Sequence, residues 1–405
     1  MQQSAVRFGI LSRGPRLFST RRLVDEGRAR GLDVRVVDPL LLTLGVTDDD
    51  LQVTLRGHPI HFDAVLPRIG YSITRHGVAV LRHFERQGVA CVNSSQAVLR
   101  SRDKLHATQA LSRHGIAMPK TVYVRDPRDI DSAIQRVGGG SVVVKVTEGT
   151  QGNGVILCHN PPEARRIVEA MLRTGVNVII QQYIRESHGT DVRMLVVGDE
   201  VVAAMRRRSR GDEFRSNYHL NGTVEQFSPP DEYVRTALDA ARILGLNVAG
   251  VDLLDGRDGP LLLEVNSSPG LQGIEEASKV NVASKIIEYV IESAHFSPTN
   301  LEPLMRSRKG HGVLRLPIPT SAGVIGKSLE VMFSDFENMP TFALVRHDSL
   351  IWLPPPDTLI EGGDELLCFG PLRSLRAYLS NLLTEKAMGM VSIDPGFGQD
   401  IRNLM

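Results

Sequence analysis

An apolar ribbon with a turn at its centre, VAGVDLLDGRDGPLLLEVN, occupies residues 248–266. The turn-rich residues Asp255–Gly259 separate two apolar runs, which predicts a β-hairpin with strands Val248–Leu254 and Pro260–Val265. Leucine and valine occupy both alternating sets of strand positions. We therefore expect this hairpin to be buried on both faces of its sheet.

Three oxygen-bearing side chains share one face of this hairpin. If the chain turns about Asp258, Asp252 stands directly opposite Glu264, about 4.5 to 5.5 Å away between Cβ atoms. Asn266 lies two residues further on and shares that face. Such donors suit Mg²⁺ or Mn²⁺, and two neighbouring carboxylates would repel unless a cation lay between them. The alternative is a solvated polar strand face.

The overall composition is that of a soluble globular protein. The chain has 405 residues, a formal net charge of +1, 42% hydrophobic and 23% charged residues, and this length predicts two to four packing units. Cys91, Cys158 and Cys368 are too far apart to suggest a disulfide framework or a zinc cluster. No uninterrupted apolar stretch reaches the roughly 18 residues of a membrane span. We expect a cytoplasmic protein without a membrane segment.

Positive charge is concentrated in the first third of the chain. Residues 1–120 contain 18 Lys and Arg against 10 Asp and Glu. This balance favours anionic partners, although aromatic residues are not interleaved as in many nucleic-acid-binding surfaces. The alternative is a basic surface that only water covers.

The order of apolar and helical patterns divides the chain. Strands at Val6–Leu11, Asp33–Val37 and Phe62–Ile69, with helices at Ser19–Arg30 and Val78–Gln87, predict a small open α/β sheet with parallel strands. No Gly-x-Gly-x-x-Gly follows the first strand, so a dinucleotide-binding fingerprint is missing.

The middle of the chain predicts an α+β region that is mostly antiparallel. A helical pattern covers Ser101–Gly115 and another covers Asp231–Leu244, and Gly198-Asp199 predicts a tight hairpin. The expected strands before the hairpin at 248–266 are Val142–Val146, Gly154–Cys158, Val178–Tyr183, Val192–Val197 and Glu200–Met205.

The polar, basic stretch from Ser297 to Gly312 is the best linker candidate. Short apolar runs with Pro and Gly between them follow it and predict a small β-rich module. These runs are Val313–Ile318, Thr341–Val345, Leu350–Leu353 and Glu365–Phe369.

A glycine-rich loop, Glu148–Gly154, follows the strand that carries Lys145. Such a loop can offer backbone N–H groups to phosphates while the lysine supplies a positive charge. The loop is not a Walker A motif, because no Gly-Lys-Ser/Thr opens a helix, and a simple hairpin turn is the alternative. Lys104 begins a predicted helix and by itself would be an ordinary surface lysine.

Further candidates lie at the ends of predicted strands. Gln182 and Tyr183 end an apolar strand and could offer their backbone to an adenine edge, unless the strand simply reaches the surface. Asp191 and Arg193 share a strand face, which fits ribose and phosphate contacts or an ordinary surface ion pair.

Two basic segments complete the candidate set. Arg215 and Asn217 in the segment 214–217 could grip phosphate and metal, although most loop arginines do neither. On a strand, the basic run at 206–210 would split between two faces, so about half of its side chains would point toward a cleft. The alternative is that the run is a solvated edge strand, which its charge protects. No order of Ser, His and Asp indicates a hydrolytic triad.

Taken together, these motifs resemble the RimK-type α-L-glutamate ligases of the ATP-grasp superfamily, which add glutamates to the C-terminus of a small-subunit ribosomal protein. The resemblance runs from Val6 to His295. The segments that carry it are 11–13, 62–65, 67–70, 102–104, 148–152, 214–217, 249–252 and 264–270.

The resemblance implies an ATP-grasp fold: an open α/β pre-ATP-grasp domain, two α+β lobes that close on ATP, and here a small β-rich C-terminal domain. The implied boundaries are 1–97 for the pre-ATP-grasp domain, 98–185 for the small lobe, 186–297 for the large lobe with the metal site, 298–311 for the linker, 312–385 for the C-terminal module and 386–405 for a tail.

The resemblance also implies roles for single residues. Lys104 and Lys145 would bind phosphate, Gln182 and Tyr183 would form the adenine hinge, and Asp191 would contact ribose. Arg215, Ser216 and Asn217 would complete the nucleotide site, while Asp252, Glu264 and Asn266 would hold two Mg²⁺ or Mn²⁺ ions bridged by Glu264. Arg215, Lys145 and Glu264 would be the catalytic residues.

Three departures from the family are visible. Gln182 stands where the family commonly has Glu, and Arg206 stands where a relative has Glu. Roughly the last 95 residues lie outside the family core. Within them, the segments 326–329, 356–360 and 362–367 resemble the C-terminal ligand-binding subdomain of RCK/TrkA regulators, which implies a regulatory or dimerising unit with a small-molecule effector and a homo-oligomer.

The implied reaction is ATP-dependent ligation of L-glutamate to the C-terminal carboxylate of a peptide or protein, such as a ribosomal protein, through an acyl phosphate. Four alternatives stay open. They are another ATP-grasp amino-acid ligase, a poly-α-glutamate synthase, a phosphotransferase on the same scaffold, and a nucleotide sensor without catalysis.

Overall fold

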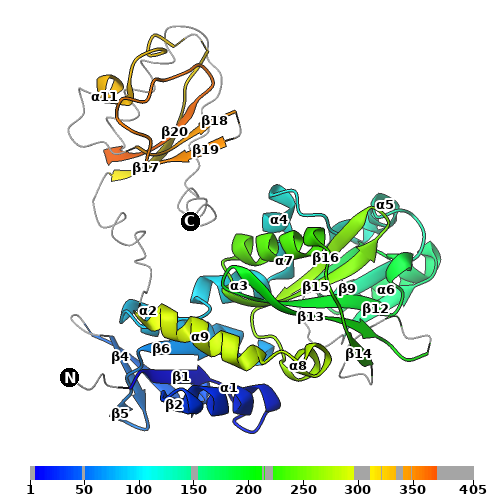
Figure 1. Cartoon of the computed structure of the whole chain (residues 1–405). Coiled ribbons are helices and arrows are strands. Elements are labelled where there is room, and N and C mark those ends of the chain that lie inside the picture. The colour runs from blue at the N-terminus through cyan, green and yellow to red at the C-terminus, as the bar shows by residue number, and fades with distance from the viewer. Residues whose placement is uncertain are drawn as a thin grey trace. The chain divides into compact units, whose positions relative to one another are not determined.

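The computed structural model describes residues 5–47, 51–146, 154–211, 214, 222–295, 311–320, 322–333, 341–347 and 349–371. The predicted glycine-rich loop therefore lies almost wholly outside the described residues, as do Arg215, Ser216 and Asn217. The chain divides into two compact units, Met1–Ser297 and Pro298–Met405. Figure 1 shows the elements of each unit.

The first unit begins with a parallel α/β sheet, as predicted. Its strand order is β2-β1-β6-β7, and every pairing in it is parallel. The strands are β1 (Arg7–Leu11), β2 (Asp33–Val37), β6 (Ala64–Pro67) and β7 (Ala90–Cys91), and the helices are α1 (Phe18–Ala29), η1 (Pro39–Leu41), η2 (Tyr71–Ile73) and α2 (Thr74–Arg86). The strand β6 is shorter than the predicted Phe62–Ile69.

This N-terminal domain contains elements that the sequence pattern did not reveal. A small antiparallel sheet is formed by β3 (Leu42–Val46), β4 (Leu51–Leu55) and β5 (His58–Pro59). The single helix predicted over Ser101–Gly115 was wrong in extent: the structure has α3 (Ser95–Arg102) and α4 (Lys104–Arg113). Asp103 separates them because its side chain accepts a hydrogen bond from the N–H of His106 at 3.0 Å and caps α4. Lys104 begins its helix, as expected.

An antiparallel sheet with two covering helices follows, and we call it the small lobe. Its strand order is β10-β9-β11-β8. Its elements are β8 (Thr121–Val124), η3 (Pro127–Asp129), α5 (Ile130–Arg136), β9 (Val142–Val146), β10 (Val155–Cys158), α6 (Pro161–Arg173) and β11 (Val178–Gln182). Val144 and Ile180 pack with Ile134 of α5 and Val168 of α6, so the helices cover one face. The cross-strand row Tyr123, Ile179, Lys145 and Val155 lies on the opposite face.

A five-stranded antiparallel sheet forms what we call the large lobe, with the order β14-β13-β12-β15-β16. Its elements are η4 (Arg185–Ser187), β12 (Thr190–Val197), β13 (Glu200–Arg208), β14 (Thr223–Gln226), α7 (Asp231–Leu244), β15 (Val248–Gly256), β16 (Gly259–Asn266), α8 (Gln272–Ser278) and α9 (Val282–His295). Helix α7 covers one face, where Met194 and Val251 pack with Leu244. Leu195 and Met205 on the other face pack with α8 and α9. The bounds of α7 are those predicted.

The hairpin of β15 and β16 confirms the expected pairing of Asp252 with Glu264. Its turn is shorter than expected, because Gly256 pairs with Gly259, and a β-bulge after Asp252 restores the register. The expectation that both strands are buried on both faces was wrong for β16. In that strand Leu262 and Val265 are buried but Glu264 is exposed. The reason is that β16 is an edge strand and helix α7 covers only one of its two faces.

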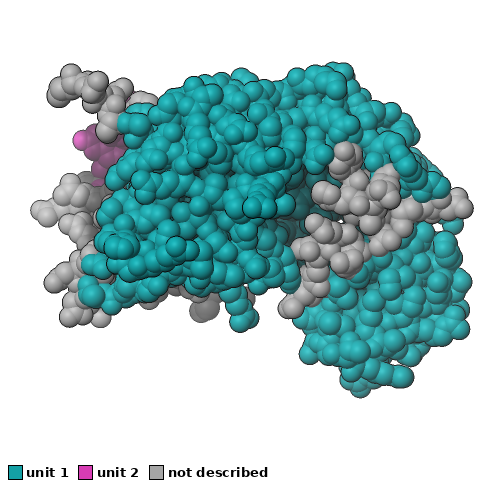
Figure 2. All heavy atoms as spheres, turned by 90° about the horizontal axis from the view of Figure 1, so that it is seen from below, with its two compact units in different colours: residues 1–297 teal, residues 298–405 magenta. Residues whose placement is uncertain are grey.

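A buried asparagine holds the N-terminal domain to the large lobe. Asn93 donates to the carbonyl oxygens of Val248 (2.7 Å) and Ser267 (3.1 Å), and its own oxygen accepts from the N–H groups of Asn247 and Val248. Ser268 also donates to the carbonyl of Pro67 at 3.2 Å. The segment after β16 is therefore held against the end of β6. In the space-filling view, this unit has a recess between its larger and smaller parts (Figure 2).

The second unit is a small β-rich module, as predicted, with its own hydrophobic core. Its antiparallel sheet has the order β17-β20-β18-β19. The elements are β17 (His311–Pro317), α11 (Leu329–Met332), β18 (Thr341–Arg346), β19 (Ser349–Trp352) and β20 (Glu365–Pro371). Leu316, Leu344 and Leu366 lie in its core, and buried Asp364 accepts two hydrogen bonds of 2.8 Å from Arg346. In the parts of both units that the structure describes, none of the helices combines the length and apolar character of a membrane span.

Candidate active site

A buried network of ion pairs connects strands β12, β13 and β15 of the large-lobe sheet. Asp252 accepts two hydrogen bonds of 2.6 Å from Arg193, and Arg207 lies 3.0 Å from the same carboxylate. Arg207 also pairs with Asp191 through two bonds, one of 2.6 Å and one shorter. Asp191, Arg207 and Asp252 are each exposed by 4% or less, so the network is shielded from water.

The charges in this network stabilise one another. Burial raises the pKa of Asp252, but Arg193 and Arg207 outweigh it and hold the value below its usual range. Burial likewise opposes the charge of Arg207, but the carboxylates of Asp252 and Asp191 raise the pKa of its guanidinium. Asp191 and Arg193 do not form the surface ion pair that was one alternative, because each is paired with a residue on a neighbouring strand.

These arginines correct the argument that only a bound cation could relieve repulsion between Asp252 and Glu264. The positive charges beside Asp252 come from the protein itself, from Arg193 and Arg207. Arg207 was only one member of the basic run at 206–210 in the sequence. Alternation on β13 turns Arg207 inward and leaves Arg208 exposed with Glu225, so the run does divide between two faces.

The predicted metal ligands are nevertheless brought together. Asp252 and Glu264 are cross-strand partners, and the Asn266 amide nitrogen lies 3.5 Å from Asp252 Oδ2. Glu264 is exposed and has no hydrogen-bond or ion-pair partner among the described residues. These residue types are those that Mg²⁺ and Mn²⁺ prefer, and in this structure both oxygens of Asp252 accept hydrogen bonds from Arg193. Nowhere in the described ranges, this site included, does a group of three or more His, Cys, Asp or Glu side chains occur that could hold a metal ion.

Cationic side chains from two other parts of the first unit lie within electrostatic reach of Glu264. Burial lowers the pKa of Lys145 to about 8, Glu264 opposes this shift and Lys104 adds to it. Lys104 donates a hydrogen bond to the carbonyl of Val146 at 3.3 Å. Burial also lowers the pKa of Arg102, and Glu264 opposes that shift. Lys145 is thus within electrostatic reach of the other predicted phosphate-binding lysine and of a predicted metal ligand.

Sequence reasoning missed two arginines at this junction. Arg102 donates to the carbonyl of Ile69 at 2.7 Å, and burial together with Arg102 lowers the pKa of Arg68 to about 10. Both residues belong to the segments that carry the family resemblance, 67–70 and 102–104. Their presence in those segments is the signal that could have singled them out.

The predicted hinge lies at the end of β11. The N–H of Gln182 donates to the carbonyl of Lys120 at 2.8 Å, and its side-chain oxygen accepts from the N–H of Lys120. The Tyr183 hydroxyl contacts Nδ1 of His188, and burial raises the pKa of Tyr183. Because the Gln182 N–H already has a partner, an adenine contact here would use its carbonyl or the main chain of Tyr183.

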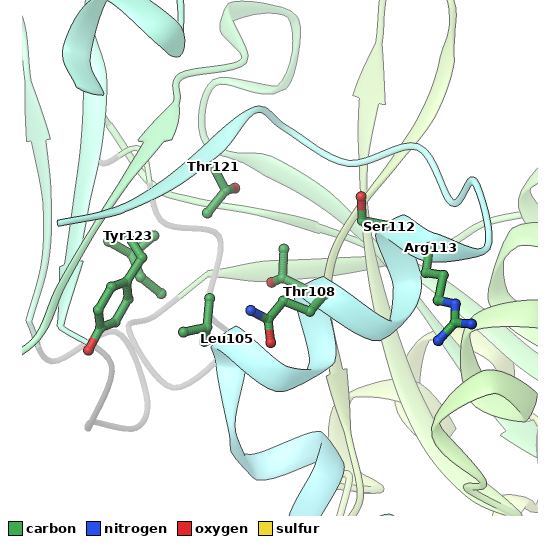
Figure 3. Close-up of a pocket in the computed structure, with 8 residues that line it drawn as sticks. Leu105, Thr108, Ser112, Arg113, Thr121 and Tyr123 are labelled. Carbon is green, nitrogen blue, oxygen red and sulfur yellow. The ribbon is translucent and has the colours of Figure 1, made fainter. Parts of the chain in front are cut away.

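A pocket of about 420 Å³ opens between α4 and the small-lobe sheet. Thr108 and Ser112 of the helix and Thr121 and Tyr123 of β8 line it, and the side chain of Arg113, at the end of the helix, points away from Tyr123 (Figure 3). Tyr123 belongs to the same cross-strand row as Lys145. The pocket therefore continues the sheet face on which the predicted phosphate-binding lysine lies.

Two α+β lobes that bring Lys145 of one within electrostatic reach of Glu264 of the other, joined to a parallel α/β domain, define the class of ATP-grasp ligases. Residues 101–290 match the RimK-like ATP-grasp domain, and residues 6–98 match the RimK PreATP-grasp domain. The chain belongs to this RimK-like family of ATP-grasp ligases, and it is an enzyme.

Curated relatives support this assignment over most of the chain. A probable alpha-L-glutamate ligase of Rhodopirellula baltica is 43% identical over 372 residues, which are 92% of each chain. One of Aeromonas salmonicida is 50% identical over 286 residues, 70% of this chain and 96% of its own. The first match is longer than the first unit, so it extends into the second, whereas the second relative is almost fully covered by 286 residues.

Solved structures share the fold. The ATP-grasp ligase PsnB complexed with a minimal precursor has a TM-score of 0.58 at 21% identity, covering 72% of this chain and 99% of PsnB. A RimK domain protein from Sphaerobacter thermophilus has a TM-score of 0.55 at 23% identity, covering 70% of this chain and 99% of its own. These likenesses establish the ATP-grasp architecture.

Proposed function

We propose that this ligase joins L-glutamate to the C-terminal carboxylate of a peptide or protein, such as a ribosomal protein, through an acyl phosphate. The observation that carries the proposal is that Lys145 lies within electrostatic reach of both Lys104 and Glu264, while Glu264 pairs across the hairpin with Asp252. The names of the relatives support glutamate as substrate. The neighbour PsnB, solved with a precursor peptide, supports a peptide acceptor.

In the proposed reaction, the chain's own residues hold and neutralise the triphosphate. Lys104 and Lys145 would contact phosphate oxygens, and Arg215, which lies outside the described residues, would contact the transferred phosphoryl group. Asp252, Glu264 and Asn266 would hold Mg²⁺ or Mn²⁺, which supplies positive charge to the phosphates when bound. The acceptor carboxylate attacks the γ-phosphorus and ADP leaves; the glutamate amine then displaces phosphate and forms the amide.

A product-mass assay with ATP, Mg²⁺, glutamate and peptides tests this function. Glutamate added to the peptide C-terminus together with ADP and phosphate supports it. Growth of glutamate chains without a peptide would indicate a poly-α-glutamate synthase, and another added amino acid a different ligase. A phosphorylated product would indicate a phosphotransferase, and tight ATP binding without turnover a nucleotide sensor.

Changing Lys145 to alanine is expected to weaken ATP binding by about 1.5 to 3 kcal/mol, because a charge-assisted hydrogen bond is lost. In the wild-type enzyme, ATP affinity should also fall as the pH rises through about 8, since the buried amine then loses its proton. The folded chain releases this proton more readily than the unfolded chain, so stability should rise with pH over that window. Calorimetric titration between pH 6.5 and 9.5 measures the affinity.

Lys145→Arg is the matched variant, because arginine stays protonated across this range. Its ATP affinity should be nearly independent of pH. An unchanged Kd in Lys145→Ala would remove Lys145 from the nucleotide site.

We also propose that the second unit is an RCK/TrkA-C-like regulatory module that binds a small effector and joins copies of the chain. Its separate core supports independent folding. The edge strand β19 carries exposed Ile351 and Trp352, and Leu353, which follows it, is 72% exposed.

The three free cysteines, which lie apart, support a cytoplasmic location.

Removing the chain after Ser297 is expected to preserve ligation and to lower the oligomeric mass, because the first unit keeps its core and site. Light scattering coupled to size exclusion measures the mass. In the full chain, Trp352→Ser should lower it in the same way. An insoluble, inactive truncated chain would instead indicate that the module is purely structural.

A further inference from the structure

Arg193, Asp252 and Glu264 form one row across three neighbouring strands of the large-lobe sheet. Arg193 of β12 pairs in register with Asp252 of β15, which pairs in turn with Glu264 of β16. Directly opposed residues of antiparallel strands point to the same face of a sheet, so a guanidinium, a buried carboxylate and an exposed carboxylate follow one another on that face. Arg193 therefore lies next to the carboxylate that a divalent cation would have to share with Glu264.

The Asp252 carboxylate has little capacity left for another cation. A carboxylate accepts at about four lone-pair positions. Arg193 takes one on each oxygen, with Nε 2.6 Å from Oδ1 and Nη2 2.6 Å from Oδ2. At Oδ2, Nη2 of Arg207 also lies 3.0 Å away and the Asn266 amide nitrogen 3.5 Å away. A metal ion at the remaining position on Oδ1 would lie against the Arg193 guanidinium, and like charges repel strongly in a site that is shielded from water.

Of the two arginines that contact Asp252, Arg193 is the one that can leave without breaking a second ion pair. The side chain of Arg207 is 3% exposed and lies between two carboxylates, those of Asp191 and Asp252. The side chain of Arg193 is 17% exposed, and in the described part of the chain Asp252 is its one hydrogen-bond and ion-pair partner. Withdrawal of Arg193 would free positions on both oxygens of Asp252, while Arg207 would continue to balance the charge of this buried carboxylate.

We propose that Arg193 is a positioning residue that competes with the divalent cation for Asp252: it holds this carboxylate in the nucleotide-free enzyme and must release it before Asp252 can act as a metal ligand. This inference rests on the proposed ligase function, whose metal ligands it concerns. The negative charge of a bound triphosphate favours the release, because it attracts the guanidinium away from Asp252. The nucleotide-free enzyme is therefore expected to bind divalent cations weakly, although the three predicted ligands already lie together.

Titration of the nucleotide-free full chain with Mn²⁺, followed by electron paramagnetic resonance of the free ion, measures this competition without turnover. Arg193→Met should bind Mn²⁺ about tenfold more tightly than the wild type or better, because both oxygens of Asp252 lose their competitor. Arg193→Lys keeps a positive charge beside Asp252, which protects folding, but lysine cannot form the two parallel bonds, so its affinity should be intermediate. In an Asp252→Asn background, Arg193→Met should change the affinity by less than about twofold.

The matched control is Arg208→Met, which removes the same charge from an exposed pair with Glu225 on the neighbouring strand β13 and should change Mn²⁺ affinity by less than about twofold. Equal affinities of the wild type, Arg193→Met and Arg193→Lys would overturn the inference. Equal gains in Arg193→Met and Arg208→Met would overturn it too, because they would reflect net charge alone. A gain from Arg193→Met that persists in the Asp252→Asn background would do the same, because the effect would not pass through Asp252.

The mass assay separates this inference from the proposed function. If Arg193→Met gains Mn²⁺ affinity as expected but no acceptor gains glutamate with the wild type, the competition for Asp252 stands and the ligase proposal fails. If the affinity does not change while the wild type adds glutamate to an acceptor, the inference fails and the ligase function stands.

Discussion

Changing Glu264 to glutamine is expected to abolish ADP formation, lowering turnover by about 10²- to 10³-fold or more. Glutamine keeps the shape of the side chain but removes the negative charge that the candidate metal site requires and that raises the pKa of Lys145. Glu264 is exposed and has no partner among the described residues, so the fold should not depend on its charge. A coupled assay of ADP release with glutamate and acceptor present measures the effect.

The matched control is Glu225→Gln in β14 of the same sheet, where the carboxylate forms an exposed pair with Arg208. This variant should retain turnover. Thermal unfolding should show similar midpoints for the wild type and both variants. Full turnover in Glu264→Gln would contradict the role assigned to Glu264. It would also contradict the proposed metal site, because Glu264 is one of its ligands.

Changing Arg207 to methionine is expected to lower the free energy of unfolding by about 3 to 5 kcal/mol. Among the described residues, the Asp191 carboxylate accepts hydrogen bonds from Arg207 alone, so the variant would leave this buried carboxylate without those partners. Asp252 would keep only Arg193 as a positive neighbour. Chemical denaturation monitored by circular dichroism measures the change in the first unit.

The dependence on pH provides a second measure of the Arg207 network. The pKa of Asp252 is lower in the folded chain than the roughly 4 expected when it is unfolded. Its contribution to stability is therefore present above about pH 4 and is lost as the pH falls through the folded value. Arg207→Met should reduce this acid-dependent part.

Two variants sharpen the interpretation of Arg207→Met. Arg208→Met removes an exposed pair on the same strand and should change stability by about 1 kcal/mol or less. Adding Asp191→Leu to Arg207→Met should recover part of the loss, because the unpaired carboxylate is removed as well. A loss no larger than that of Arg208→Met would show that the network does not stabilise the fold.

Local patterns predicted the elements well where hydrogen bonding connects neighbours in the chain. The helix Asp231–Leu244 was predicted with its final bounds, since Gly245 ends it in the left-handed conformation. The hairpin was predicted with its key pair, but its β-bulge was not, because a single extra residue leaves no apolar signature. The break between α3 and α4 was missed although Asp103 is a favoured helix cap.

Within the candidate site, the sequence by itself determined which residues share a strand face. Asp252, Glu264 and Asn266 meet because the alternation and register of one hairpin place them together. Only the tertiary structure decided what surrounds them. Lys145 lies more than 100 residues before Glu264 in the chain, and only the fold brings the two side chains within electrostatic reach.

The inward position of Arg207 is also a tertiary result. Its strand alternation was predictable, but the choice of the buried face depends on pairing with Asp191 and Asp252 of two further strands. Short-range hydrogen bonding and side-chain alternation are encoded within a few residues, whereas the burial of a charge depends on which distant surfaces pack against it.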